Sequence, residues 1–249
     1  MNILILATAL AAGSADAPVT APPITAAPVA APVSAEQRKL ALELARAMNS
    51  EELTRAQISK MLDDTLPKTF AATPQFAAME KDHPGVTKAV IEAMRPIIVT
   101  STLARLPSLW ERLAPIYTRM FSVAELHTLL DFYTSPAGAR VIKTMGEGAD
   151  YSRMLGDMVA NNNSVVTSDG VTAGVQSGVA QVIRSATPED MKAMIALVAT
   201  SAGKKLPMLN REVQAASIAW GNEPEPELDA QVESAVKDAV VKYLGKPAQ

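Results

Sequence analysis

The stretch FSVAELHTLLDFYTSPAGAR, Phe121–Arg140, carries the clearest fold signal in the chain. Ser122 followed three residues later by Glu125 is a capping box, which marks the start of an α-helix. The apolar residues that follow recur at spacings of three and four, so they share one helix face. They are Leu126, Leu129, Leu130 and Tyr133. Ser135-Pro136 then suits the N-cap and first turn of another helix. The stretch therefore predicts two helices joined almost without a loop.

A fainter copy, ATPEDMKAMIALVATSAGKK, lies 65 residues further on at Ala186–Lys205. Thr187 and Asp190 take the two capping-box positions. The four apolar positions recur as Met191, Met194, Ile195 and Val198. We therefore predict a helical hairpin used twice, at about 121–160 and 186–220, with both copies packed into one bundle.

Comparison of the two copies shows which residues repeat as part of the scaffold and which side chains capable of chemistry do not repeat. Gly138 corresponds to Gly203, where a small residue lets two helix backbones approach closely, and Arg140 corresponds to Lys205, which we expect on the solvent side. The residues without a chemical counterpart are His127, Asp131 and Phe132, which become Lys192, Ala196 and Leu197. The caps and apolar faces repeat, whereas the side chains capable of chemistry do not. We therefore interpret the motif as a scaffold.

Helical signals continue before the hairpins. Ser34 with Gln37 forms a capping box at the start of the first helix, and Asn49 with Glu52 caps the next. The segment LPKTFAATPQF, 66–76, breaks the helical pattern with two prolines.

Prolines divide the segment that follows. A helix is expected from Gly85 to about Leu106, with a kink at Pro96. Pro107 suits the first turn of a further helix, which Pro115 kinks or ends early.

The last third of the chain contains two further features. Gly170, Gly174 and Gly178 recur every four residues and predict either close helix packing or a mobile loop within 161–186. The loop GNEPEPE precedes an amphipathic helix over 226–244. Its inward residues are expected to be Val232, Val236, Val240 and Tyr243. The fold class predicted from all these signals is all-α, an irregular helical bundle built around two related hairpins.

Composition agrees with this fold class and excludes several kinds of function. Apolar residues make up 48% of the chain but aromatics only 4%, which favours helices over a sheet sandwich. The net charge is −3 and no long basic block occurs, which argues against a nucleic-acid partner. The absence of cysteine excludes disulfides, thiolate metal sites and cysteine nucleophiles.

The N-terminal residues are typical of an export signal followed by a spacer. Ile3–Ala12 is an apolar run too short to span a bilayer, and Ala15-Asp16-Ala17 fits a small-x-small cleavage site, although no Lys or Arg precedes the run. A proline- and alanine-rich stretch without charge follows. We assign 1–17 to a signal peptide, 18–34 to a disordered Pro/Ala-rich linker and 35–249 to the helical domain, which is then periplasmic or secreted. The alternative is an apolar tail on a cytoplasmic protein.

The segment LAPIYTRMFSVAELHTLLDFYTSPAGARVIKTM, Leu113–Met145, resembles the core motif of the domain-of-unknown-function 2059 family. The matching elements are Tyr117, Phe121-Ser122, Glu125-Leu126, Phe132-Tyr133, Ser135-Pro136 and Gly138. The resemblance implies a bacterial, mostly exported, α-helical domain. It implies no established activity and supplies no catalytic residues.

Few residues are candidates for chemistry. His127 and Asp131 lie four residues apart and share a helix face, but two ligands are too few for zinc, and the other histidine, His83, sits in a Pro-Gly turn. We interpret His127 and Asp131 as a surface pair. The sequence contains no recognised nucleophile or phosphate-binding motif, so no catalytic residue, metal or cofactor is predicted.

Four aromatic residues are either core residues or the lining of an apolar groove between the hairpins: Trp110, Phe121, Phe132 and Tyr133. The expected function is that of a noncatalytic binding or interaction module of the bacterial envelope. Its partner would be an unknown envelope protein, a peptide or an apolar ligand, with no nucleic acid and no transmembrane span. Two alternatives stay open: a hydrolytic enzyme with an unrecognised active site, and a structural or dimerising protein that uses the glycine-spaced segment. The oligomeric state is not predicted.

Overall fold

The computed structural model describes residues 32–160 and 165–245, and within these ranges every regular element is a helix. The all-α prediction is therefore confirmed, whereas the predicted signal peptide and most of the predicted linker lie outside the described residues. The elements are α1 (Ala35–Met48), α2 (Glu51–Lys60), the π-helix η1 (Met61–Thr65), α3 (Leu66–Ala72), α4 (Pro74–Asp82), α5 (Val86–Met120), α6 (Val123–Thr134), α7 (Pro136–Gly148), α8 (Ser152–Ala160), α9 (Ser168–Ser185), α10 (Pro188–Ala199), α11 (Ser201–Gly221) and α12 (Pro226–Leu244).

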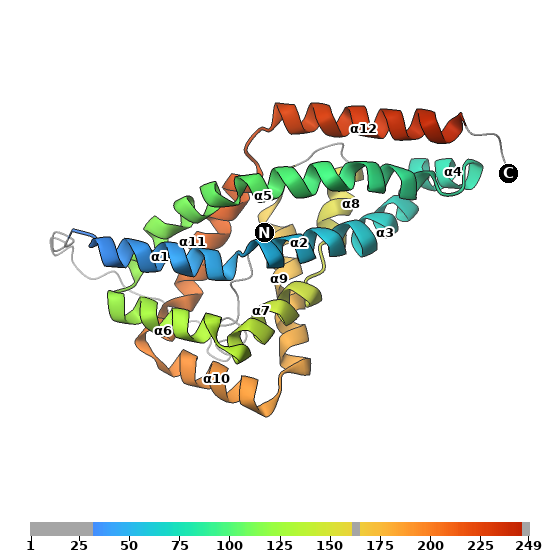
Figure 1. Cartoon of the computed structure of the whole chain (residues 1–249). Helices are drawn as coiled ribbons and strands as arrows, with labels where there is room; N and C mark the ends of the chain where they lie inside the picture. The colour runs from blue at the N-terminus through green and yellow to red at the C-terminus, as the bar shows by residue number, and fades with distance from the viewer. Residues whose placement is uncertain (1–31, 161–164, 246–249) are drawn as a thin grey trace, which may run out of the picture.

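Helix α5 organises the molecule. Figure 1 shows it extending across most of the structure, with α12 lying along one side and α6, α7 and α10 on the other. Its C-terminal half packs against α1 and α11, while α2, α3 and α4 contact its N-terminal part. A large apolar cluster lies between the hairpins, α1 and the C-terminal end of α5. A smaller cluster joins α2, η1 and α3 to the N-terminal half of α5 through Ile58, Leu62, Leu66, Phe70 and Ile91.

The prediction that prolines divide α5 is wrong, because one helix of 35 residues contains Pro96, Pro107 and Pro115. Proline removes one backbone hydrogen bond, yet packing on both of its sides can hold a helix together. Leu106 and Leu109, on either side of Pro107, are both buried in the main core. Tertiary contacts therefore override the local stop signal.

One predicted capping box and one predicted helix start need correction near the N-terminus. Ser34 caps α1 as expected, but the Gln37 side chain donates hydrogen bonds to the carbonyls of Thr118 and Phe121 at the end of α5 rather than completing a capping box. Ser50 caps α2, one residue after the predicted Asn49.

The break predicted within 66–76 is confined to Thr73, which separates α3 from α4. The two prolines of this segment lie in the first turns of α3 and α4, where a missing N–H costs nothing. The Phe70 ring stacks on that of Phe76 with their centroids 4.3 Å apart, which joins these two short helices.

Both hairpins begin as the sequence predicts. Ser122 and Glu125 form a complete capping box at α6, and Thr187 and Asp190 form one at α10. The second helix of each hairpin starts at a hydroxyl N-cap, Ser135 for α7 and Thr200 for α11. The apolar face of α10 is less covered than predicted, because Ile195 is 56% exposed and Leu197 takes a core position instead.

The acids of the two capping boxes also join the hairpins to each other. The Glu125 carboxylate accepts a hydrogen bond from Lys205 Nζ on α11 at 2.8 Å. In the opposite sense, the Asp190 carboxylate accepts one from Arg140 Nη2 on α7 at 2.6 Å. Glu125 corresponds to Asp190 and Arg140 to Lys205 in the sequence, so each hairpin gives one acid and one base to the other. The basic residues are partly exposed, as expected, but both are paired.

Gly138 and Gly203 make the sharp break in each hairpin possible. A Cβ at Gly138 would lie closer than 3.0 Å to the carbonyl of Phe132, and one at Gly203 would lie equally close to that of Leu197. The expected close backbone approach is thus present in both hairpins.

The glycine-spaced segment is helical over Ser168–Ser185 and serves packing within the chain. Gly170 lies against Met154, and Gly174 lies against the Tyr151 ring. Gly178 meets the backbone of α7 at Met145. Residues 161–164 of the segment lie outside the described residues.

We predict that Gly138→Ala and Gly203→Ala each destabilise the fold by about 1–3 kcal/mol, because each new methyl group forces the two helices apart. Gly156→Ala is the matched control, since no heavy atom lies within 4 Å of its Cβ position and the substitution should stabilise α8 by about 0.5–1 kcal/mol. Urea unfolding monitored by circular dichroism measures all three changes. Equal stability of the three variants would contradict this account of the break.

The cross-hairpin ion pairs should make stability depend on acidic pH. Burial opposes ionisation of Glu125, but hydrogen bonds from Lys205, Ser122 and Ser201 outweigh it and lower its pKa from 4.5 to about 2. The hydrogen bond from Arg140 likewise lowers the pKa of Asp190. Because the pKa of Glu125 is lower in the folded state, its contribution to stability is fully present above pH 4.5 and is lost as the pH falls to 2.

Glu125→Gln should therefore cost about 2 kcal/mol at pH 7, and the difference from wild type should shrink between pH 4.5 and pH 2. The control is Glu111→Gln, at an exposed position on α5, which should change stability by less than about 0.5 kcal/mol. Denaturant unfolding at a series of pH values checks both. A constant difference from pH 7 to pH 2 would show that the ion pair does not contribute as described.

Candidate functional site

The aromatic residues predicted as a groove lining belong to the core. Phe121 is 1% exposed, and Phe132 and Tyr133 are buried against each other with their ring centroids 5.0 Å apart, edge to face. Trp110 is partly buried, donates a hydrogen bond to the Asn49 carbonyl and lies beneath the Arg46 guanidinium. The structure thus favours the alternative in which these four side chains hold helices together.

The predicted surface pair is exposed as expected. His127 is 54% exposed, and its Nε2 lies 3.9 Å from the Glu36 carboxylate on α1. Asp131 is also exposed. In the part of the chain that the structure describes, no group of three or more potential metal ligands occurs.

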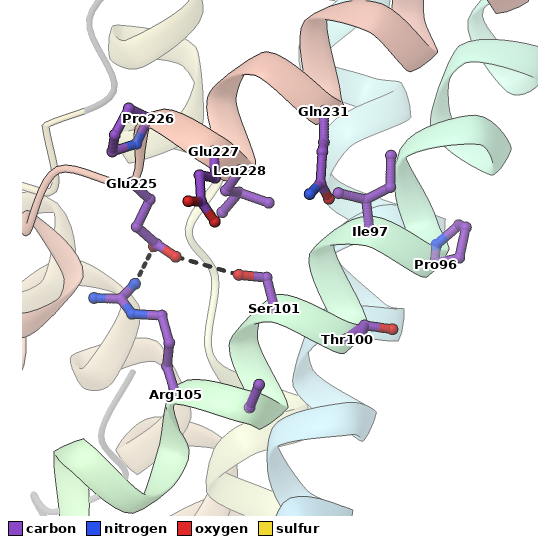
Figure 2. A pocket seen from close by; sticks show the side chains of 11 residues that line it. Pro96, Ile97, Thr100, Ser101, Arg105, Glu225, Pro226, Glu227, Leu228 and Gln231 are labelled. Atoms are coloured by element: carbon purple, nitrogen blue, oxygen red, sulfur yellow. Dashed lines mark hydrogen bonds and ion pairs between the residues drawn. The ribbon is translucent and has the colours of Figure 1, made fainter.

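A cavity with a partly apolar lining lies in the seam between α5 and α12. It has a volume of about 710 Å³ and separates the α5 segment from Pro96 to Arg105 from the first turns of α12. Figure 2 shows Ile97 and Thr100 on α5 and Leu228 and Gln231 on α12 around this space. Its volume lies within the range of small-molecule pockets, about 300–1,000 Å³.

One end of the cavity carries a fixed group of charges. The Glu225 carboxylate forms an ion pair with Arg105 and accepts a hydrogen bond from the Ser101 hydroxyl at 3.2 Å (Figure 2). Arg105 also donates to the Trp220 carbonyl at 2.9 Å and stacks over the Trp220 ring at 4.5 Å. Glu223 approaches the same guanidinium at 3.4 Å. Arg105 is thus held on several sides, so this end of the cavity has a defined shape.

The rest of the cavity mixes apolar and acidic groups. Figure 2 shows the side chains of Glu227 and Leu228 at the cavity on the α12 side, opposite Ile97. A bound molecule would therefore meet apolar surface in the middle and hydrogen-bonding groups at the ends. This combination suits the binding and orientation of a ligand.

A second cavity of about 440 Å³ lies further along the same seam. Its α5 side consists of Ala89 and Ala93, and its α12 side includes Ala235, Ala239 and Tyr243. The inward face of α12 carries the predicted valines and Tyr243, and all of them are only half-buried. Helix α12 contains no fully buried residue. Half-buried side chains therefore make the contact between α5 and α12, and two cavities interrupt it.

A third cavity of about 430 Å³ lies on the smaller apolar cluster. The π-helix η1 supplies Leu62 and Asp63 to it, and Asp63 accepts a hydrogen bond from Arg95 at 2.5 Å. Glu80 at its edge accepts hydrogen bonds from the backbone amides of Gly85 and Thr87, which begin α5. Burial opposes ionisation of Glu80, but these hydrogen bonds lower its pKa. The carboxylates here and Arg95 already bind one another or the end of a helix.

The seam was missed by sequence analysis for a definite reason. The amphipathic pattern of Pro226–Leu244 predicted the correct inward face, but it did not identify α5 as the surface that this face covers. The one available signal was the excess of small and aliphatic residues in the α5 segment between Val86 and Ala104.

Comparison with known proteins identifies the hairpin but not the seam. Residues 108–157 match the family described as "Uncharacterized protein conserved in bacteria (DUF2059)". The match confirms the resemblance expected from Leu113–Met145. It includes α6, α7 and the end of α5, whereas the residues lining the cavities lie outside it. Neither a curated protein nor a solved structure matches the chain.

Proposed function

We propose that the protein is a noncatalytic binding module of the bacterial envelope and that it takes an apolar ligand or peptide segment in the seam between α5 and α12. The observation that carries this proposal is the cavity of about 710 Å³ beneath a helix with no fully buried residue. A helix held in this way can move aside for a ligand at little cost to the core.

The lining of the cavity supports binding rather than hydrolysis. Arg105 and Glu225 neutralise each other, and neither lies beside a histidine among the residues that line this space. His127, on which the alternative of a hydrolytic enzyme relied, lies on α6 and is exposed. The alternative of dimerisation through Gly170, Gly174 and Gly178 loses its support, because these glycines pack within the chain.

An envelope location rests on the sequence and on the matched family. The apolar run and cleavage site in residues 1–17 support export, and the family model is bacterial. Among the described residues, no helix is long and apolar enough to cross a membrane. Export with cleavage after Ala17 leaves Pro18 as the first residue, and N-terminal sequencing of the protein recovered from a periplasmic fraction would find Met1 instead if there were no cleavage.

We also propose that the two hairpins are copies of one unit. The matching caps, the matching glycine contacts and the reciprocal ion pairs support a common origin. The cost of alanine at Gly138 and at Gly203 tests the equivalence of the two copies. Closely similar losses of stability are expected, and a large difference would argue that the two breaks are unrelated.

Binding in the seam can be tested with the fluorescent probe 8-anilinonaphthalene-1-sulfonate. Ala104 lies on the cavity wall and is exposed, so Ala104→Trp should fill the space without disturbing the core. We expect this variant to lose most of the fluorescence enhancement that wild type gives. Ala124→Trp, at an exposed position on α6, is the matched control and should bind as wild type does.

Two results would overturn the proposal. One is the absence of any enhancement with wild type, and the other is an equal enhancement with both tryptophan variants. Circular dichroism of both variants shows whether they keep their helices, so a loss of probe binding can be separated from a loss of fold.

A further inference from the structure

We infer that α12 exchanges between two copies of the chain, so that the α12 of each copy docks on the α5 of the other. The inference rests on the proposed function only in using the same seam. The occupant of the α5 surface is the α12 helix of a second copy, because α12 already fits this surface within one chain.

The attachment of α12 is confined almost entirely to α5. Figure 1 shows α12 lying beside α5 at the edge of the molecule, and α5 is its main neighbour. Half-buried side chains along its inward face supply the apolar contact; they are Leu228, Val232, Val236, Val240 and Tyr243. Two cavities interrupt this contact. Separation of α12 therefore leaves the main core intact.

Polar contacts at the two ends fasten α12 in place. Glu225, which precedes the helix, pairs with Arg105 and Ser101 on α5. At the other end the Tyr243 hydroxyl donates a hydrogen bond to the Pro84 carbonyl, just before α5. These end contacts fix the register of α12, and an α12 helix from another copy would make the same contacts.

The connection before α12 suits a hinge. The Asn222 side chain accepts a hydrogen bond from the backbone N–H of Val166 and donates one to its carbonyl. Glu223 forms an ion pair with Arg112, so these contacts fix the chain as far as residue 223. Pro224 and Pro226 then disfavour helix at the residues before them, so α11 and α12 do not join as one helix. The chain can therefore change direction at this connection between the closed and the exchanged form.

The released surfaces are self-complementary. Opening exposes an apolar stripe on α12 and another on α5, which is unfavourable in water. Two opened copies cover both stripes by exchanging their helices, and they recover every contact of the closed form. Such exchange of an identical element is a low-cost route to a dimer.

Charge reversal across the Arg105–Glu225 pair tests the exchange. One full-length population carries Arg105→Glu and the other carries Glu225→Arg, so that like charges meet at the seam within each chain. In a mixed exchanged dimer both seams carry opposite charges. The first population also carries Ala93→Cys and the second Ala239→Cys, at two positions that line one cavity. The natural chain has no cysteine, so each disulfide reports a designed position.

The expected result is a disulfide-linked product of twice the chain mass, formed several-fold faster in this mixture than between cysteine variants with natural charges. A single chain carrying both cysteines is the control, and its internal disulfide shows that the two positions meet. Should charge reversal prevent folding, the natural-charge mixture still decides, because its double-mass yield should exceed that of a mixture in which Ala124→Cys, at an exposed position on α6, replaces Ala239→Cys.

The exchange is overturned if the internal disulfide forms while neither mixture gives the double-mass product. It is also overturned if the product forms at the same rate whatever the charges, which indicates random collision. Failure of exchange leaves probe binding in the closed chain unaffected. If the helices exchange but wild type does not bind the probe in the seam, only the proposed function is contradicted.

Discussion

The fold depends on two carboxylates that each perform two structural roles. Glu125 begins α6 by accepting from the Ser122 backbone N–H, and it also binds Lys205 on the other hairpin. Asp190 begins α10 in the same way and binds Arg140. A carboxylate that satisfies helix-end amides is fixed in position before it meets its cation, so the ion pair loses little conformational freedom. The start of each hairpin thereby sets its orientation toward the other.

The hairpins fix the C-terminal end of α5, whereas cavities lie along its N-terminal half. Lys205 donates a second hydrogen bond to the Met120 carbonyl, and Gln37 donates to the carbonyls of Thr118 and Phe121, so the last turn of α5 is tied to both α11 and α1. The N-terminal half of α5 instead supports the smaller apolar cluster and α12. The cavities of the seam lie along this half, where binding can occur without disturbing the hairpins.

Local signals predicted much of the fold, and long-range contacts account for the rest. The caps at Ser122 and Thr187 are set by residues within one turn, so sequence suffices to find them. The continuity of α5 through Pro107 depends on Leu106 and Leu109 packing against distant helices, which no local pattern encodes. The same holds for the seam, since the stripe on α12 predicts that a partner exists but not which one. The sequence left the role of the aromatic residues open, because large apolar side chains suit a core and a pocket equally well.

The central claim is that α12 separates from α5 while the hairpin body stays folded. Hydrogen exchange of the intact chain followed by mass spectrometry tests it directly, because exchange reports the free energy of opening for each segment. The account predicts that amides of α12 exchange at an opening free energy several kcal/mol below that of α6 and α11. Protection of α12 equal to that of α6 would contradict it, since α12 would then open only with the whole molecule.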